Sequence, residues 1–131
     1  MPWMCFGFLV PDERVQNLGK ILFEHDHPNR TVPDRVAHAT YGASASMAFL
    51  SQAKEIWTRP DVIMVYTRNR QSIERVVSLF DNFSTPPGKL GTSKYPGPKQ
   101  VTPEIIEQFQ KFLEIDTKPR WYYMVDQPHG L

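Results

Sequence analysis

The apolar positions of the chain fall into short segments that predict both strands and helices. Residues 3–10, 62–66 and 121–125 are apolar or aromatic at nearly every position, as is typical of strands covered on both faces. Residues 12–25, 34–57, 70–80 and 102–113 instead repeat their larger apolar side chains at helical spacing. The pattern therefore predicts the order strand, helix, helix, strand, helix, helix, strand.

Two of the predicted helices have further signals. Thr102, Pro103 and Glu104 are suited to the cap, the first helical position and the first turn of the last helix. The helix over residues 34–57 is built mostly from Ala, Ser and Gly between residues 37 and 48. A helix with such small side chains approaches a sheet or a ligand closely, so we expect a functional site along it.

Helical connections between buried strands favour right-handed crossovers. We therefore expect an α/β fold, with a small, mostly parallel or mixed sheet covered by helices on both faces. The length of 131 residues fits a single domain over residues 1–131. Residues 81–100 form a long irregular loop with four prolines, three glycines and three lysines, and loops of this length are usually functional or mobile.

Charge and cysteine content narrow the class of protein. A formal net charge of +1 gives no global attraction to nucleic acid or to an acidic membrane. Cys5 is the only cysteine, which excludes an intrachain disulfide and favours a reducing, cytoplasmic compartment. Its apolar surroundings indicate a buried thiol rather than a nucleophile. No segment reaches the ~20 apolar residues of a membrane span, and the apolar start lacks the basic region of a secretory signal.

His38 is the first candidate for catalysis. It shares a helix face with Gly42, and Tyr41 lies beside them. A histidine next to a glycine notch suits a general acid or base acting on a ligand against that face, with the Tyr41 hydroxyl near the reacting group. The alternative is a half-buried histidine bonded to a carbonyl or to water.

Other candidates lie after the predicted strands. Asp126 follows the last strand, where a carboxylate can orient a histidine or accept a proton; the alternative is a turn residue that binds its own backbone. Arg68 and Arg70 suit a clamp for a phosphate or carboxylate, helped by the loop lysines, against the alternative of a solvated loop. The five tyrosines suit a pocket lining, base stacking or a core. The short cluster at residues 25–27 lacks a third ligand, so we expect neither a metal nor a cofactor.

Three segments resemble the type 2 peptidyl-tRNA hydrolase fold and its diverged non-hydrolase relatives. Residues 34–43 resemble its signature helix, residues 60–80 its second strand and helix, and residues 121–127 the strand that carries its acid. The resemblance implies an α/β fold and places Asp126 at the acid position. It also places Arg35 at a lysine position and Gly42 where the family has its catalytic histidine. These departures imply a changed or a lost reaction.

Three hypotheses about function follow. The first is a diverged, hydrolase-like enzyme that acts on an acyl or other small-molecule substrate. His38, Asp126 and Tyr41 would carry acid–base chemistry, and the substrate would be bound by Arg35, Gly42, Arg68 and Arg70. The second is a non-enzymatic module that binds RNA, a nucleotide or a protein through the lysine-bearing loop and residues 68–70. The third is a structural subunit whose small-residue helix packs on a second copy, as a homodimer.

Overall fold

The structure, a computed structural model, describes residues 2–30, 34–67 and 71–127, and gives only the backbone for residues 34–40 and Ala43. Its regular elements, in chain order, are β1 (Met4–Val10), α1 (Asp12–Asp26), α2 (Asp34–Ala53), β2 (Asp61–Thr67), β3 (Ser72–Asp81), a 3₁₀ turn (Pro98–Gln100), α3 (Pro103–Leu113) and β4 (Arg120–Met124). The predicted strands over residues 3–10, 62–66 and 121–125 and the helices over residues 12–25 and 102–113 are confirmed.

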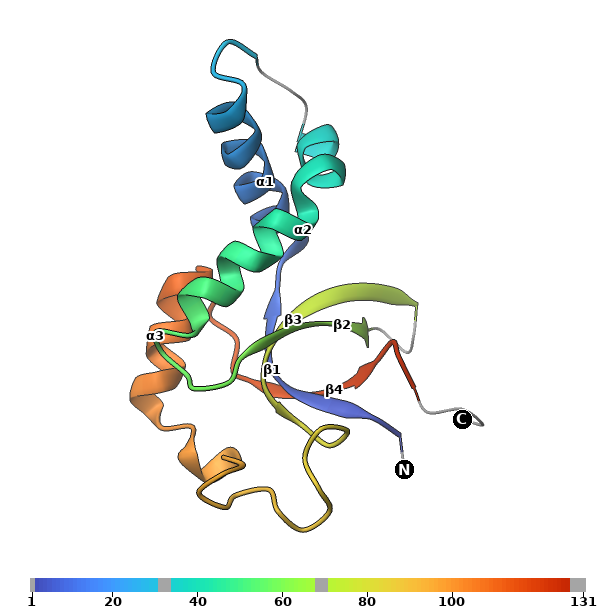
Figure 1. Ribbon diagram of the computed structural model, residues 1–131, viewed down its shortest axis with the longest axis vertical. Helices are drawn as coiled ribbons and strands as arrows, with labels where there is room; N and C mark the ends of the chain where they lie inside the picture. The colour runs from blue at the N-terminus through green and yellow to red at the C-terminus, as the bar shows by residue number, and fades with distance from the viewer. Residues whose placement is uncertain (1, 31–33, 68–70, 128–131) are drawn as a thin grey trace.

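The four strands close into a small barrel in the order β1-β3-β2-β4 (Figure 1). β1 pairs with β3 and β4, β2 also pairs with β3 and β4, and all four pairings are antiparallel. The pairing of β1 with β3 shifts register between Phe6 and Gly7. At Gly7 a Cβ atom would lie only 2.1 Å from the Val77 carbonyl oxygen, so the close approach of these two strands requires glycine.

The predicted helix over residues 70–80 is wrong, because this segment forms strand β3. The apolar residues that suggested helical spacing also suit a strand covered on both faces, and β3 is buried continuously from Val76 to Asp81. Only residues 68–71 separate β2 from β3. So short a connection joins neighbouring antiparallel strands and leaves no room for a crossover helix.

The predicted α/β fold, with a mostly parallel sheet covered on both faces, is therefore wrong. The sheet is antiparallel and closed, and helices do not cover it on both faces. The peptidyl-tRNA hydrolase-like architecture fails with it, because the crossover connections of an α/β fold are replaced by the hairpin of β2 and β3.

The buried side chains form two clusters. One lies between the barrel and the helices and includes Phe8 and Val77 from the strands, Phe49 from α2 and Phe109 from α3. The other lies among the four strands and contains Cys5, Ile63, Val65, Val76 and Met124. β1 and β3 both contribute to the two clusters, and β3 has the longest continuous buried segment, from Val76 to Asp81.

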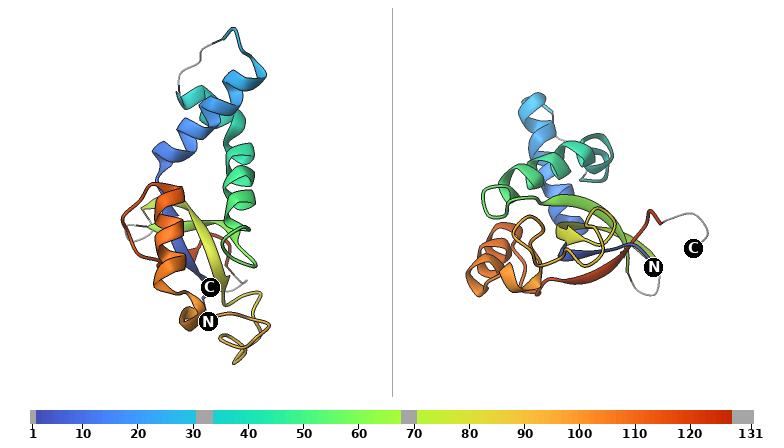
Figure 2. Two further views of the ribbon diagram at one scale, coloured as in Figure 1. Left: turned by 90° about the vertical axis from the view of Figure 1, so that its left-hand side faces the viewer. Right: turned by 60° about the horizontal axis from the view of Figure 1, so that its bottom comes forward.

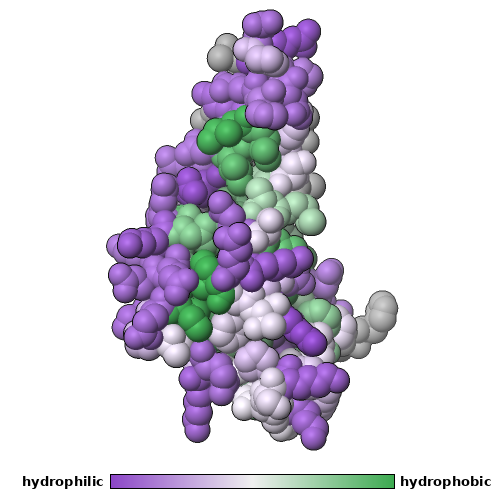
Figure 3. Space-filling view, turned by 60° about the vertical axis from the view of Figure 1, so that its left-hand side comes forward, coloured by the Kyte–Doolittle hydropathy of each residue, from purple (hydrophilic) through white to green (hydrophobic). Residues whose placement is uncertain are grey.

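Helices α1 and α2 pack against each other as an antiparallel pair, here called the helical arm, whose far end extends away from the barrel (Figures 1 and 2). Figure 3 shows apolar side chains gathered along the arm, where Ile21 and Met47 are exposed. Within the described part of the chain, no helix has the length and apolar character needed to cross a membrane.

Candidate functional site

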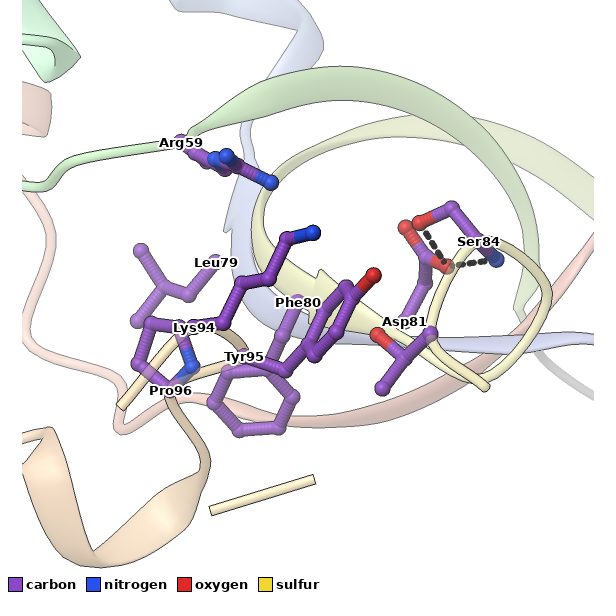
Figure 4. Close-up of a pocket in the computed structure, with 9 residues that line it drawn as sticks. Arg59, Leu79, Phe80, Asp81, Ser84, Lys94, Tyr95 and Pro96 are labelled. Carbon is purple, nitrogen blue, oxygen red and sulfur yellow. Dashed lines mark hydrogen bonds between the residues drawn. The ribbon is translucent and has the colours of Figure 1, made fainter. Parts of the chain in front are cut away.

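A cavity of about 200 Å³ lies at the end of β3, beneath the loop that follows it (Figure 4). Three segments distant in sequence contribute to it: the chain just before β2, the end of β3 with the turn after it, and the middle of the loop. The lining residues are Arg59, Leu79, Phe80, Asp81, Ser84, Thr85, Lys94, Tyr95 and Pro96.

The floor of the cavity is apolar and well anchored. Leu79 and Phe80 are buried, and the Phe80 ring stacks on Phe6 with the centroids 4.8 Å apart. The buried Trp57 indole donates a hydrogen bond of 2.8 Å to the Leu79 carbonyl oxygen. This bond ties the segment that carries Arg59 to the end of β3, since Arg59 is only two residues from Trp57.

One wall is a turn held by Asp81. A single carboxylate oxygen, Oδ1, accepts hydrogen bonds from the backbone N–H of Phe83 (3.1 Å), the backbone N–H of Ser84 (2.7 Å) and the Ser84 hydroxyl (2.7 Å). This is the local bonding that makes aspartate a frequent turn residue. The turn fixes Ser84 and Thr85 at the edge of the cavity.

The opposite wall is the loop that presents Lys94 and Tyr95. The backbone N–H of Gly91 donates to the Tyr95 carbonyl oxygen over 2.7 Å, which closes this part of the loop on itself. Gly97 packs directly on Gly91, since a Cβ atom at Gly97 would lie 3.0 Å from the Gly91 nitrogen. The loop is thereby braced where it carries the two cavity residues.

Two cations converge on the cavity. Figure 4 shows the charged ends of Arg59 and Lys94 pointing toward the same space, with the Tyr95 hydroxyl directed toward Asp81 and Ser84. The Lys94 ammonium also lies 5.7 Å from the centroid of the Tyr95 ring, within the range of a cation–π contact. The cavity thus combines an apolar floor, two cations, three hydroxyls and one carboxylate.

The structure does not bring together the elements that carry His38 and Asp126. His38 and Arg35 lie in the first turns of α2, within the arm, where only the backbone is described. Asp126 is exposed just beyond β4, and Figure 1 shows the end of β4 at the barrel, away from the start of α2. Acid–base chemistry by His38 and Asp126 therefore stays a prediction.

Tyr41 and Gly42 have places in the arm rather than in the cavity. The Tyr41 hydroxyl donates to Oδ2 of Asp26 over 2.9 Å and so joins α2 to the end of α1. This bond raises the pKa of Tyr41 and lowers the pKa of Asp26. Gly42 is buried, and a Cβ atom there would lie 3.4 Å from a terminal nitrogen of Arg75.

The remaining candidates from the sequence are the two arginines of the predicted anion clamp and the short cluster at residues 25–27. Arg68 and Arg70 lie outside the described residues. Asp26 lies 3.6 Å from His25 through Oδ1 and Nδ1, at the exposed end of α1. No group of three or more His, Cys, Asp or Glu side chains suited to a metal ion occurs among the residues that the structure describes.

The sequence reasoning found part of the cavity and missed the rest. It named the three loop lysines, which include Lys94, and the five tyrosines, which include Tyr95, as candidates among others, but not Arg59, Asp81, Ser84 or Thr85. The aspartate that ends an apolar segment and is followed three residues later by serine was the available signal for the turn. Nothing local indicated that Arg59 would meet the loop.

No protein-family model, no curated protein and no solved structure matches this chain.

Proposed function

We propose that this protein is a binding module that takes a small organic anion in the cavity between the end of β3 and the following loop. The observation that carries the proposal is the convergence of Arg59 and Lys94 on one hollow. Guanidinium and ammonium groups form charge-assisted hydrogen bonds with carboxylates and phosphates. Arg59 supplies a planar set of donors, and Lys94 supplies a compact charge.

The floor indicates that the anion carries an apolar or flat body. Leu79 and Phe80 lie at the base of the cavity, and the Tyr95 ring stands beside them. The volume of about 200 Å³ is small, since ligand pockets commonly measure about 300–1,000 Å³. This size supports a compact metabolite or part of a nucleotide as the occupant rather than a long polymer.

The charge balance supports binding that is specific but modest in strength. Arg59 and Lys94 are both exposed, so solvent screens their attraction for an anion. The Asp81 carboxylate opposes it, although three donors surround its Oδ1 oxygen. We therefore expect an affinity that falls as salt is added, and a requirement for both cations.

The proposal includes the cytoplasmic location that the sequence indicates. Cys5 is a free, buried thiol, which supports a reducing compartment.

Calorimetric titration with phenyl phosphate, a compact anion with a flat apolar body, tests the proposal. We expect saturable binding that Arg59→Gln and Lys94→Gln each weaken about tenfold, because a hydrogen bond to a charged group contributes about 1.5–3 kcal/mol. Phenol should not bind detectably, since it lacks the charge. Lys89→Gln is the matched control: it removes the same charge from the same loop, but Lys89 does not line the cavity.

Two results would reject the proposal. One is the absence of saturable phenyl phosphate binding by the unaltered protein. The other is a loss of affinity in Lys89→Gln as large as in Lys94→Gln, which would mean that the overall charge of the loop, and not the cavity, attracts the anion.

A further inference from the structure

We infer that the anion bound in this cavity is a phosphorylated sugar. The inference rests on the proposed function and adds the class of ligand. The turn accounts for Oδ1 of Asp81, but neither the turn nor the binding of a simple anion accounts for the second carboxylate oxygen in the wall of a cationic cavity.

Asp81 is only 8% exposed, and its two oxygens have different surroundings. Oδ1 accepts all three hydrogen bonds that hold the turn. No hydrogen bond between the described residues uses the second oxygen, Oδ2, although the side chain lines the cavity. A carboxylate oxygen can only accept, so a ligand that suits it must donate a hydrogen bond.

A hydroxyl group is the donor that fits these surroundings. The hydroxyls of Ser84, Thr85 and Tyr95 line the same cavity. Each of them both donates and accepts, and sugar hydroxyls do the same. Ser84 uses its proton on Asp81 and keeps its lone pairs for a donor on the ligand. This end of the cavity therefore suits a polyol better than an apolar or purely anionic group.

The cationic end suits a phosphate monoester. Such a group carries about −1.5 to −2 charges at pH 7 and has three acceptor oxygens. Arg59 and Lys94 approach from two sides, and the three oxygens of a tetrahedral phosphate let each cation bond to a different oxygen at the same time. With the phosphate between the cations and the hydroxyls at Asp81, the apolar face of the sugar ring rests on Leu79 and Phe80.

The experiment compares ribose 5-phosphate with n-butyl phosphate, which has the same charged group and no hydroxyls. We expect the unaltered protein to bind ribose 5-phosphate at least about tenfold more tightly, the order of discrimination that paired and unpaired polar groups produce. In Asp81→Asn the amide oxygen still accepts the bonds of the turn, but Oδ2 is replaced by a donor. The variant should lose most of the preference, because a sugar hydroxyl bonds to a neutral amide more weakly than to a carboxylate. It should also bind n-butyl phosphate more tightly, because the repelling charge is gone.

The outcomes separate this inference from the proposed function. Equal affinity of the unaltered protein for the two phosphates would overturn the sugar assignment and leave anion binding intact. Binding of neither would reject both. If Asp81→Asn does not fold, Thr85→Val tests the inference in its place, and it should reduce the preference for ribose 5-phosphate over n-butyl phosphate. The matched control is Thr117→Val, at an exposed residue outside the cavity, which should leave that preference unchanged. An unchanged preference in Thr85→Val would then overturn the inference.

AMP serves as a third probe, because the same chemistry occurs in free sugar phosphates and in nucleotides. Affinity for AMP above that for ribose 5-phosphate would support a nucleotide as the source, and lower affinity would support a free sugar phosphate.

Discussion

At the scale of single residues, burial determines the chemistry of the one thiol. Cys5 has no exposed surface, and burial is the main cause that raises its pKa from 9.0 to about 12, against the opposing effect of a hydrogen bond with Ser78. The charges of Asp81 and Asp61 raise the pKa further. Cys5 is therefore suited to the core and not to nucleophilic chemistry.

This shift predicts a loss of stability at alkaline pH. The folded pKa lies above the unfolded value, so the contribution of the thiol is complete below about pH 9 and is lost as the pH rises toward 12. The free energy of unfolding should fall by up to about 1.4 kcal/mol per pH unit from this group. Urea unfolding between pH 8 and 10.5 measures how steeply the free energy of unfolding falls with pH. The fall should be less steep for Cys5→Val than for the unaltered protein, because the variant keeps the raised pKa values of Tyr41 and Tyr122 but lacks the thiol. The same pH dependence in both proteins would contradict the attribution of the alkaline loss of stability to Cys5.

At the scale of the element, α3 is the helix with the most complete local signals. The Thr102 hydroxyl accepts a hydrogen bond from the backbone N–H of Ile105, Pro103 begins the helix, and Glu114 ends it in the left-handed region at φ 56°. The face that α3 turns inward contains the fully buried Phe109 and Leu113. Capping and core packing therefore support the same helix.

Removal of the Thr102 cap should lower the stability of the protein by a measurable amount. Thr102→Ala should lower the free energy of unfolding by about 0.5–2 kcal/mol, since one N–H in the first turn loses its acceptor. Thr102→Ser keeps the acceptor and should remain within a few tenths of a kcal/mol of the unaltered protein. Denaturant unfolding of the three proteins measures the difference, and equal stability of all three would show that the cap does not contribute.

At the scale of the whole molecule, the closed barrel and the helical arm differ in how they are held. Each strand is paired on both sides, so the barrel has no open edge. The far end of the arm is supported mainly by the packing of α1 on α2, with the bond between Tyr41 and Asp26 joining the helices there. The two parts should therefore open independently.

Hydrogen exchange measured by NMR tests this difference. Amides of Val76 and Val77 in β3 should exchange only through global unfolding, while those of residues 20–26 in the arm should exchange faster through local opening. Tyr41→Phe should accelerate exchange in the arm and leave the barrel amides unchanged as an internal control. Uniform protection of both parts would indicate a single cooperative unit.

The sequence by itself determined the elements whose signals are local. The apolar segment that became β1, the Thr102 cap of α3 and the loop that contains Lys94 were all identified from neighbouring residues. Only the tertiary structure decided that residues 72–81 form a strand, that the sheet closes as an antiparallel barrel, and that Arg59, Asp81 and Lys94 share one cavity. The physical reason is that the spacing of apolar residues along a chain indicates which side chains are buried. Strand pairing and the convergence of distant charges depend instead on contacts between segments, which local spacing does not determine.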